Sequence, residues 1–167
     1  MSSFEIVPLG GDYRNYVNTQ ITDSWNGPFV VARGVLHDTR NHSGFVAISE
    51  GIFAGYILYN FDENACEITV LETLINGAGI GAALIKEVLR TAREQCCQRV
   101  WLITTNDNMQ AIRFYQRFGF ELVEVFINAM DSARKLKPQI PLTGDDDIPI
   151  KHEFEFEIAL INTGDLL

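Results

Sequence analysis

The sequence is poor in cysteine and proline, has fewer basic than acidic residues, and contains no long hydrophobic run. Its three cysteines, Cys66, Cys96 and Cys97, show no metal-ligand spacing and leave one thiol over in any disulfide scheme. No segment approaches the ~18 uninterrupted apolar residues of a membrane helix, and MSSFEIVPLG lacks the basic start and apolar run of a signal peptide. We therefore expect a reduced, cytoplasmic protein with no membrane partner.

The shortage of positive charge excludes a further class of partner. There are 13 Lys and Arg residues against 22 Asp and Glu, a formal net charge of −9. Because phosphate backbones bind Lys and Arg, we expect no nucleic-acid partner. The acidic triplet at 145–147 lacks the alternating oxygen ligands and the glycine of a calcium loop, so we expect no metal.

Apolar residues, in contrast, are plentiful enough to build a core. They make up 47% of the 167 residues, and a chain of this length predicts one domain over 1–167. Apolar runs, helical periodicity and turn residues divide the chain into elements. Strands are predicted at 4–9, 29–35, 45–49, 52–61, 66–75, 100–103, 120–127 and 153–160, and helices at 13–25, from about 81 to 96, and at 108–118.

Three of these segments differ clearly in how polar and apolar residues are distributed. The helix after 81 has an apolar face formed by Leu84, Ile85, Val88, Leu89, Ala92 and Cys96. The polar segment at 37–44 is predicted to be a loop with a solvated His42, and the proline-bearing segment at 131–150 to be mostly irregular.

The segment EFEFEIAL at 153–160 alternates strictly between apolar and acidic residues. This period of two predicts a half-buried strand with Phe154 and Phe156 inside and Glu153 and Glu155 outside. As an exposed edge, the strand would allow a homodimer.

The stretch NGAGIGAAL at 76–84 places three glycines directly before a helical pattern. One interpretation is a plain turn between a strand and a helix. A dinucleotide fingerprint requires an acidic residue ~20 positions later, which is missing, and a Walker loop requires a Gly-Lys-Ser/Thr sequence, which is missing too. The remaining interpretation is an acyl-CoA diphosphate site, where glycines let main-chain N–H groups at a helix start bind one anion.

Two segments together resemble a known family. Asn76-Gly77-Ala78-Gly79-Ile80-Gly81 resembles the [Q/R]-x-x-G-x-[G/A] motif of the GNAT superfamily of N-acetyltransferases, with Asn76 in place of the usual Gln or Arg. Asn108-x-x-Ala111-x-x-x-Tyr115-x-x-x-Gly119-Phe120 resembles a second motif of that superfamily. The resemblance covers about residues 4–127, and the extension 128–167 resembles more loosely that of uncharacterised bacterial members.

The resemblance implies an α/β fold with a mixed, mostly antiparallel twisted sheet that splays open between 66–75 and 99–105. Acetyl-CoA, the implied cosubstrate, would lie in that gap without a metal. The cofactor-binding residues implied are Leu71, Thr73, Asn76, Gly77, Gly79, Ile80, Gly81, Ala82, Asn108 and Tyr115.

Direct acetyl transfer needs a neutral amine, a polarised carbonyl and a proton for the departing thiolate. The resemblance assigns that proton to the phenol of Tyr115, although a tyrosine on an apolar helix face can also simply pack in the core. Glu72 is the candidate general base, because it falls beside the expected acetyl position. Glu67 and His37 remain rivals.

The sequence thus predicts an N-acetyltransferase that acts on a primary amine of a small molecule or a peptide. Its acceptor is expected to contact the helix at 13–25, the loop at 36–44 and the proline-bearing part of the extension that begins at residue 128. A non-catalytic acyl-CoA-binding sensor or scaffold is the alternative from another class.

Overall fold

The structure is a computed structural model that describes residues 3–160. Its contacts group the described chain into two compact units. Unit 1 comprises 3–28, 39–100 and 159–160, and unit 2 comprises 29–38 and 101–158. The single domain predicted from the sequence stays a prediction, and residues 161–167 of the predicted extension lie outside the described residues.

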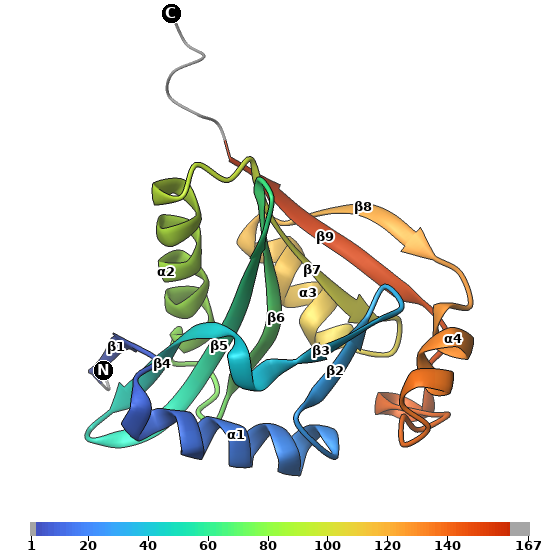
Figure 1. Cartoon of the computed structure of the whole chain (residues 1–167), viewed down its shortest axis with the longest axis horizontal. Helices are drawn as coiled ribbons and strands as arrows, with labels where there is room; N and C mark the ends of the chain where they lie inside the picture. Colours follow the sequence, from blue (N-terminus) through green and yellow to red (C-terminus); the bar gives the residue numbers. More distant parts are fainter. Residues whose placement is uncertain (1–2, 161–167) are drawn as a thin grey trace, which may run out of the picture. The chain divides into compact units, whose positions relative to one another are not determined.

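Unit 1 contains four strands, hydrogen-bonded in the order β1-β4-β5-β6, and the pairs β1–β4, β4–β5 and β5–β6 are antiparallel. The strands predicted at 45–49, 52–61 and 66–75 are confirmed as three neighbours in this sheet (Figure 1). The elements of this unit are β1 (Phe4–Pro8), α1 (Gly11–Trp25), a 3-10 turn (Thr39–Asn41), β4 (Ser43–Ser49), β5 (Ile52–Asp62), β6 (Ala65–Thr73) and α2 (Ile80–Glu94).

Unit 2 holds three strands in the order β7-β9-β8, a separate hairpin and two helices. The mixed α/β class with mostly antiparallel strands is confirmed, and the splay between 66–75 and 99–105 stays a prediction. The elements are β2 (Phe29–Ala32), β3 (Val35–Asp38), β7 (Arg99–Thr105, from Trp101 onward in this unit), α3 (Met109–Phe118), β8 (Glu121–Phe126), α4 (Ala129–Leu136), a 3-10 turn (Asp145–Asp147) and β9 (Glu153–Ala159).

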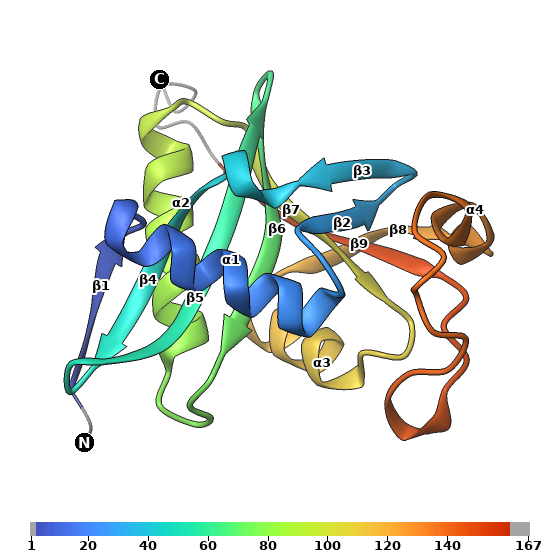
Figure 2. The same cartoon turned by 60° about the horizontal axis from the view of Figure 1, so that its bottom comes forward.

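Within unit 1, helices α1 and α2 cover opposite faces of the sheet, as both views show (Figures 1 and 2). Neighbouring residues of β5 demonstrate this, because successive side chains of a strand point to opposite faces. A Cβ at Gly55 would lie 3.3 Å from the Ile80 side chain of α2. The next residue, Tyr56, points to the other face. Its hydroxyl donates a hydrogen bond to the Glu72 carboxylate, which also accepts one from Ser24 of α1.

Gly55 also allows a close approach of β5, β6 and the start of α2. A Cβ there would lie 2.8 Å from the Glu72 carbonyl oxygen, which is main chain and cannot move aside alone. We expect Gly55→Ala to lower the free energy of unfolding by about 1–3 kcal/mol, measured by urea denaturation. Gly11→Ala, which meets open space, is the control and should change it by less than about 0.5 kcal/mol. Equal urea midpoints for Gly55→Ala and Gly11→Ala would show that position 55 accommodates a Cβ, which would contradict the close approach of these elements.

The predicted single strand at 29–35 is wrong, because the chain reverses at Arg33-Gly34 and forms the β2–β3 hairpin. Both turn residues have positive φ, 50° and 72°, which suits a two-residue hairpin turn. The predicted loop at 37–44 is too long at both ends: the hairpin brings His37 into β3 opposite Val30, and β4 already begins at Ser43, so only 39–42 lies outside the strands.

Part of the segment predicted as irregular, 131–150, is helical. Helix α4 buries Met130 and Ala133 against Ile150, which returns from later in the chain. Its buried face is short, and the rest of the helix is polar, so the local sequence alone gave little indication of it. Among residues 3–160, no helix combines the length and the apolar character needed to cross a bilayer.

The alternating strand at 153–160 is confirmed as β9, and Phe156 is buried as predicted, but the predicted exposure of Glu153 and Glu155 is wrong. Glu153 and Glu155 are buried, and β9 lies between β7 and β8 instead of at an edge. Its pairing with β8 is antiparallel, with Phe156 opposite Leu122. The exposed edge from which a homodimer was inferred is therefore absent from this strand.

Candidate functional site

The glycine loop connects β6 to α2 and is exposed over 74–77. Gly77 and Gly79 have φ angles of 76° and 78°, which L-residues rarely adopt. A Cβ at either position would meet nothing within 4 Å. The space beside this loop is therefore open, and the two glycines are required by backbone conformation. Exposed Asn76 begins the turn.

The loop ends at the N-terminus of α2, with Gly79 as the N-cap. The first intrahelical bond joins the N–H of Ala83 to the carbonyl of Gly79 at 3.1 Å. The N–H groups of Ile80, Gly81 and Ala82 precede it, so helix geometry leaves them without intrahelical acceptors. No side chain caps them at Gly79. Aligned donors at the positive end of a 15-residue helix form an anion-binding arrangement.

Strand β6 leads into this loop, and two of the cofactor-binding residues implied by the resemblance, Leu71 and Thr73, lie on its second half. Leu71 pairs with Ile57 and Thr73 with Gly55, and both are half-buried. A β-bulge lies slightly earlier in the strand, because the register shift leaves Thr69 as the extra residue.

Glu72 is held by two hydroxyl groups from different elements. The hydroxyl of Tyr56 on β5 donates to Glu72 Oε2 at 2.7 Å, and the hydroxyl of Ser24 on α1 lies 3.1 Å from Oε1. Tyr56 is completely buried. Burial, reinforced by the hydrogen bond and the negative charge of Glu72, raises the pKa of the Tyr56 phenol well above its usual value. Tyr56 therefore stays protonated and keeps donating to the carboxylate.

Register places the rival carboxylate on the same sheet face. Tyr56 pairs with Glu72 and Asn60 with Glu67, and residues 56 and 60 of β5 share a face. Glu67 is buried, not at the surface.

His42 was predicted to be solvated, which is wrong. It is buried, with Nδ1 2.8 Å from the Thr69 hydroxyl, and Arg14 of α1 donates to its carbonyl at 2.7 Å. The sequence contains no local signal for this, because both partners are distant in the chain.

In unit 2, Asn108 is the N-cap of α3. Its side-chain oxygen accepts the N–H of Ala111 at 3.2 Å. Sequence reasoning missed this role, although an asparagine directly before an apolar-periodic segment is a helix-start signal. Since the side-chain oxygen is engaged, Asn108 has its amide N–H groups with which to contact a ligand.

Tyr115, on α3, is buried among aromatic rings. Its ring centroid lies 5.5 Å from that of Phe120 and 6.3 Å from that of Phe156. Burial raises the pKa of the Tyr115 phenol above its usual value, so the hydroxyl is a proton donor over a wide pH range. These contacts are compatible with both interpretations, core packing and catalysis.

His37, the other rival base, also lies in unit 2, in β3. Burial lowers its pKa, so it is neutral and able to accept a proton near pH 7. The predicted residues thus fall in two sets. Unit 1 contains the glycine loop, Glu72 and Glu67, and unit 2 contains Asn108, Tyr115 and His37.

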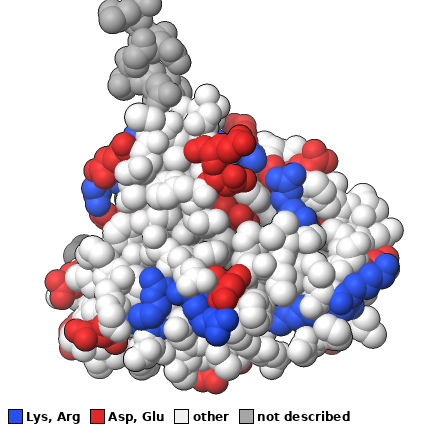
Figure 3. All heavy atoms as spheres, in the orientation of Figure 1, with Lys and Arg blue, Asp and Glu red and all other residues white. Residues whose placement is uncertain are grey.

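Surface charge adds little specificity to this arrangement. On the face drawn in Figure 3, acidic and basic side chains both occur in small separate groups. That face carries no single large basic field of the kind that a nucleic acid would require.

The glycine loop after bulged strand β6 and the uncapped start of α2 together form a site suited to an anion such as a diphosphate. The sequence model described as the acetyltransferase (GNAT) family matches residues 12–120. The chain belongs to this family and is an acyltransferase. It is 36% identical over 149 residues to the uncharacterized protein YxbD of Bacillus subtilis (strain 168), which covers 89% of this chain and 94% of that protein.

Solved structures agree on the fold. An IAA acetyltransferase from Bacillus cereus ATCC 14579 superposes with a TM-score of 0.73 at 16% identity, over 95% of this chain and 100% of that one. A GNAT family acetyltransferase from Elizabethkingia anophelis, solved with acetyl-CoA bound, gives a TM-score of 0.68 at 16% identity, over 96% and 100%. At these identities the likeness concerns the fold alone.

Proposed function

We propose that this acyltransferase moves the acetyl group of acetyl-CoA to a primary amine of a small molecule or a peptide. The observation that carries the proposal is the open glycine loop with three unpaired amides at the start of α2. Such a site suits a diphosphate and uses no lysine. Family membership and the Elizabethkingia anophelis relative with acetyl-CoA bound support the choice of cosubstrate, and membership of a transferase family favours an enzyme over a sensor.

Binding is divided among main-chain groups in this proposal. The N–H groups of Gly77, Gly79, Ile80, Gly81 and Ala82 hold the diphosphate, with Asn76 beside them. Main-chain groups of Leu71 and Thr73 contact the pantetheine arm and the acetyl carbonyl. Asn108 contacts the same arm through its amide N–H groups.

The chemistry requires three proton transfers. Glu72 takes a proton from the acceptor ammonium and releases it to solvent, and the neutral nitrogen then forms a bond to the acetyl carbon as the carbon–sulfur bond breaks. Tyr115 donates a proton to the departing thiolate, and the second proton lost by the nitrogen as the amide forms restores the Tyr115 phenol. The products are the acetylated amine and free coenzyme A, formed directly without an acetylated enzyme.

Tyr56 and Ser24 act through Glu72 as positioning residues. Their two hydroxyls bond to the carboxylate from β5 and from α1, so its orientation is set by elements on both sides. Such anchoring orients a base toward its substrate and reduces reorganisation during the reaction.

The proposal is tested by following thiol release from acetyl-CoA with a panel of primary amines. We expect release with at least one amine class, and kcat/KM reduced about 100-fold in Glu72→Gln, because an amide cannot accept the proton. The affinity for acetyl-CoA, measured by calorimetry, should be unchanged.

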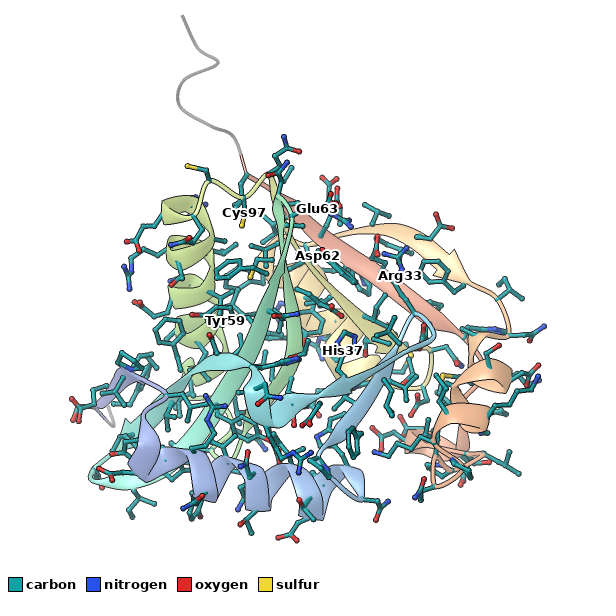
Figure 4. The ribbon with its side chains drawn as sticks, viewed as in Figure 1. Arg33, His37, Tyr59, Asp62, Glu63 and Cys97 are labelled. Atoms are coloured by element: carbon teal, nitrogen blue, oxygen red, sulfur yellow. The ribbon has the colours of Figure 1, made fainter. Side chains whose placement is uncertain are left out.

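Glu63→Gln, in the exposed turn after β5, is the matched control and should keep the wild-type rate. Figure 4 labels Glu63 in that turn. If Glu67→Gln or His37→Gln loses the rate while Glu72→Gln does not, the base assignment is wrong. If acetyl-CoA binds and no amine releases thiol, the transfer itself is refuted.

A further inference from the structure

The tip of the β2–β3 hairpin is joined to strand β9 of the same unit by Arg33. Its main-chain N–H donates to Glu153 Oε2 at 3.0 Å, and its Nη1 lies 3.1 Å from Glu155 Oε1. The guanidinium carbon is 5.4 Å from the centroid of the Trp101 ring and 5.2 Å from that of Phe126. Arg33, labelled in Figure 4, therefore directs its guanidinium to Glu155 and the two rings, and its main-chain amide to Glu153.

A cavity of about 580 Å³ opens beside this tip, entirely within unit 2. Its volume lies within the range of ~300–1,000 Å³ that small-molecule sites occupy. Besides the hairpin turn, it is lined by Val125, Phe126, Ile127, Ala129, Ser132 and Glu153. The walls are thus mainly apolar, with one serine and one carboxylate.

Glu153 is the unusual residue of this lining, because it is acidic and yet only 2% exposed. Burying a carboxylate disfavours its charged form, and burial accordingly raises the pKa of Glu153, with Arg33 acting in the opposite direction. Arg33 donates a hydrogen bond to this carboxylate from its main-chain N–H, which carries no charge. A cation at the cavity would offset the desolvation of Glu153.

We propose that this cavity binds a primary ammonium compound with an apolar body, its nitrogen at the Glu153 carboxylate and its body against Phe126 and Ile127. A carboxylate accepts several hydrogen bonds, and an ammonium group supplies three donors. Ser132 adds an acceptor at the exposed helix surface. An anionic ligand is disfavoured, because it would meet Glu153 while Arg33 is engaged with Glu155.

Three probes that share a phenylethyl body and differ in charge test the proposal by calorimetry without acetyl-CoA. They are 2-phenylethylammonium, 2-phenylethanol and 3-phenylpropanoate. We expect the ammonium to bind at least tenfold more tightly than the alcohol, and the carboxylate to bind more weakly than both. Equal affinities for ammonium and alcohol, or no binding of any probe, would overturn the proposal.

Variants then locate the binding. Glu153→Gln keeps the shape and removes the charge, so ammonium affinity should fall at least tenfold, to that of the alcohol. Glu157→Gln, on the same strand outside the cavity lining, is the charge-matched control and should bind as the wild type does. Wild-type ammonium affinity in Glu153→Gln would refute the assignment.

Because Glu153 is buried, a second variant avoids any ambiguity about folding. Ser132→Leu fills the cavity from an exposed position of α4 and should weaken binding of ammonium and alcohol alike. Lys135→Leu, on the same helix outside the lining, should leave the affinity for the alcohol unchanged. Retained binding of both probes in Ser132→Leu would show that they bind elsewhere and defeat the proposal.

The bound amine is either an acceptor of the transfer or a separate ligand. Adding acetyl-CoA and measuring thiol release distinguishes these two roles. Thiol release in the presence of the ammonium probe, lost in Glu153→Gln, identifies the cavity as part of acceptor recognition. Binding without thiol release identifies a separate ligand site. Both outcomes support the cavity, and neither depends on the success of the proposed acetyl transfer.

Discussion

Replacing Gly79 by valine is expected to weaken acetyl-CoA binding on the order of 100-fold, a loss of about 2.7 kcal/mol. Two physical effects combine. A β-branched residue is strained at the φ of 78° that this N-cap adopts, and its side chain would enter the open space beside the loop. The main-chain amides at the start of α2 then lose their access to a diphosphate. Calorimetry with coenzyme A measures the effect.

A matched variant separates strain from binding. Gly51, in the turn between β4 and β5, has a φ of 76° and also meets nothing within 4 Å. Gly51→Val should therefore lose a similar amount of stability, about 1–2 kcal/mol, while binding coenzyme A as the wild type does. If the two variants bind equally well, the loop is only a turn and the diphosphate site is refuted.

Tyr115→Phe is expected to lower kcat about 100-fold and leave the affinity for acetyl-CoA nearly unchanged. The phenylalanine ring preserves the contacts with Phe120 and Phe156, so the substitution removes the hydroxyl alone. Because burial raises the pKa of Tyr115, the wild-type hydroxyl remains protonated at alkaline pH. Steady-state kinetics, together with calorimetry, separate this effect from a binding defect.

Tyr59→Phe is the control for this substitution. Tyr59 is a buried tyrosine of β5, and burial raises its pKa as well. It lies outside the segments 76–81 and 108–120 and is labelled in Figure 4, so its variant should lose about 1 kcal/mol of stability and keep its turnover. Wild-type turnover in Tyr115→Phe would assign that residue to core packing only.

Some elements were predictable because their signals are local. Helix α2 buries Leu84, Ile85, Val88, Leu89 and Ala92, the face that the apolar period selected. Cys96 was the exception: the helix ends at Glu94, and Cys96 adopts a φ of 58° and is exposed. The end of α3 at Gly119 was likewise predictable, because a glycine there has the φ of 123° that a helix end tolerates.

The hairpin at Arg33-Gly34 was missed because its signal is weak. A two-residue turn of this kind usually carries Asn-Gly or Asp-Gly, and an arginine with positive φ is uncommon. The run FVVARGV therefore looked like one strand. The error also misplaced His37, which the turn brings into a strand beside Val30.

The burial of Glu153 and Glu155 on β9 was missed for a different reason. An alternating pattern shows that a strand has two unlike faces, but whether the polar face is buried as well depends on what packs there. Glu153 and Glu155 are buried because Arg33, 120 and 122 positions away, supplies their bonds. No local pattern contains a partner at that distance.

The sequence by itself determined the glycine loop, the helix that follows it, the second motif and thereby the family, because each depends on spacing within a few residues. Only the tertiary structure decided how Tyr56 and Ser24 hold Glu72, and which carboxylates of β9 are buried. Those arrangements depend on desolvation and on hydrogen bonds between segments far apart in the chain, which form only when the strands and helices pack.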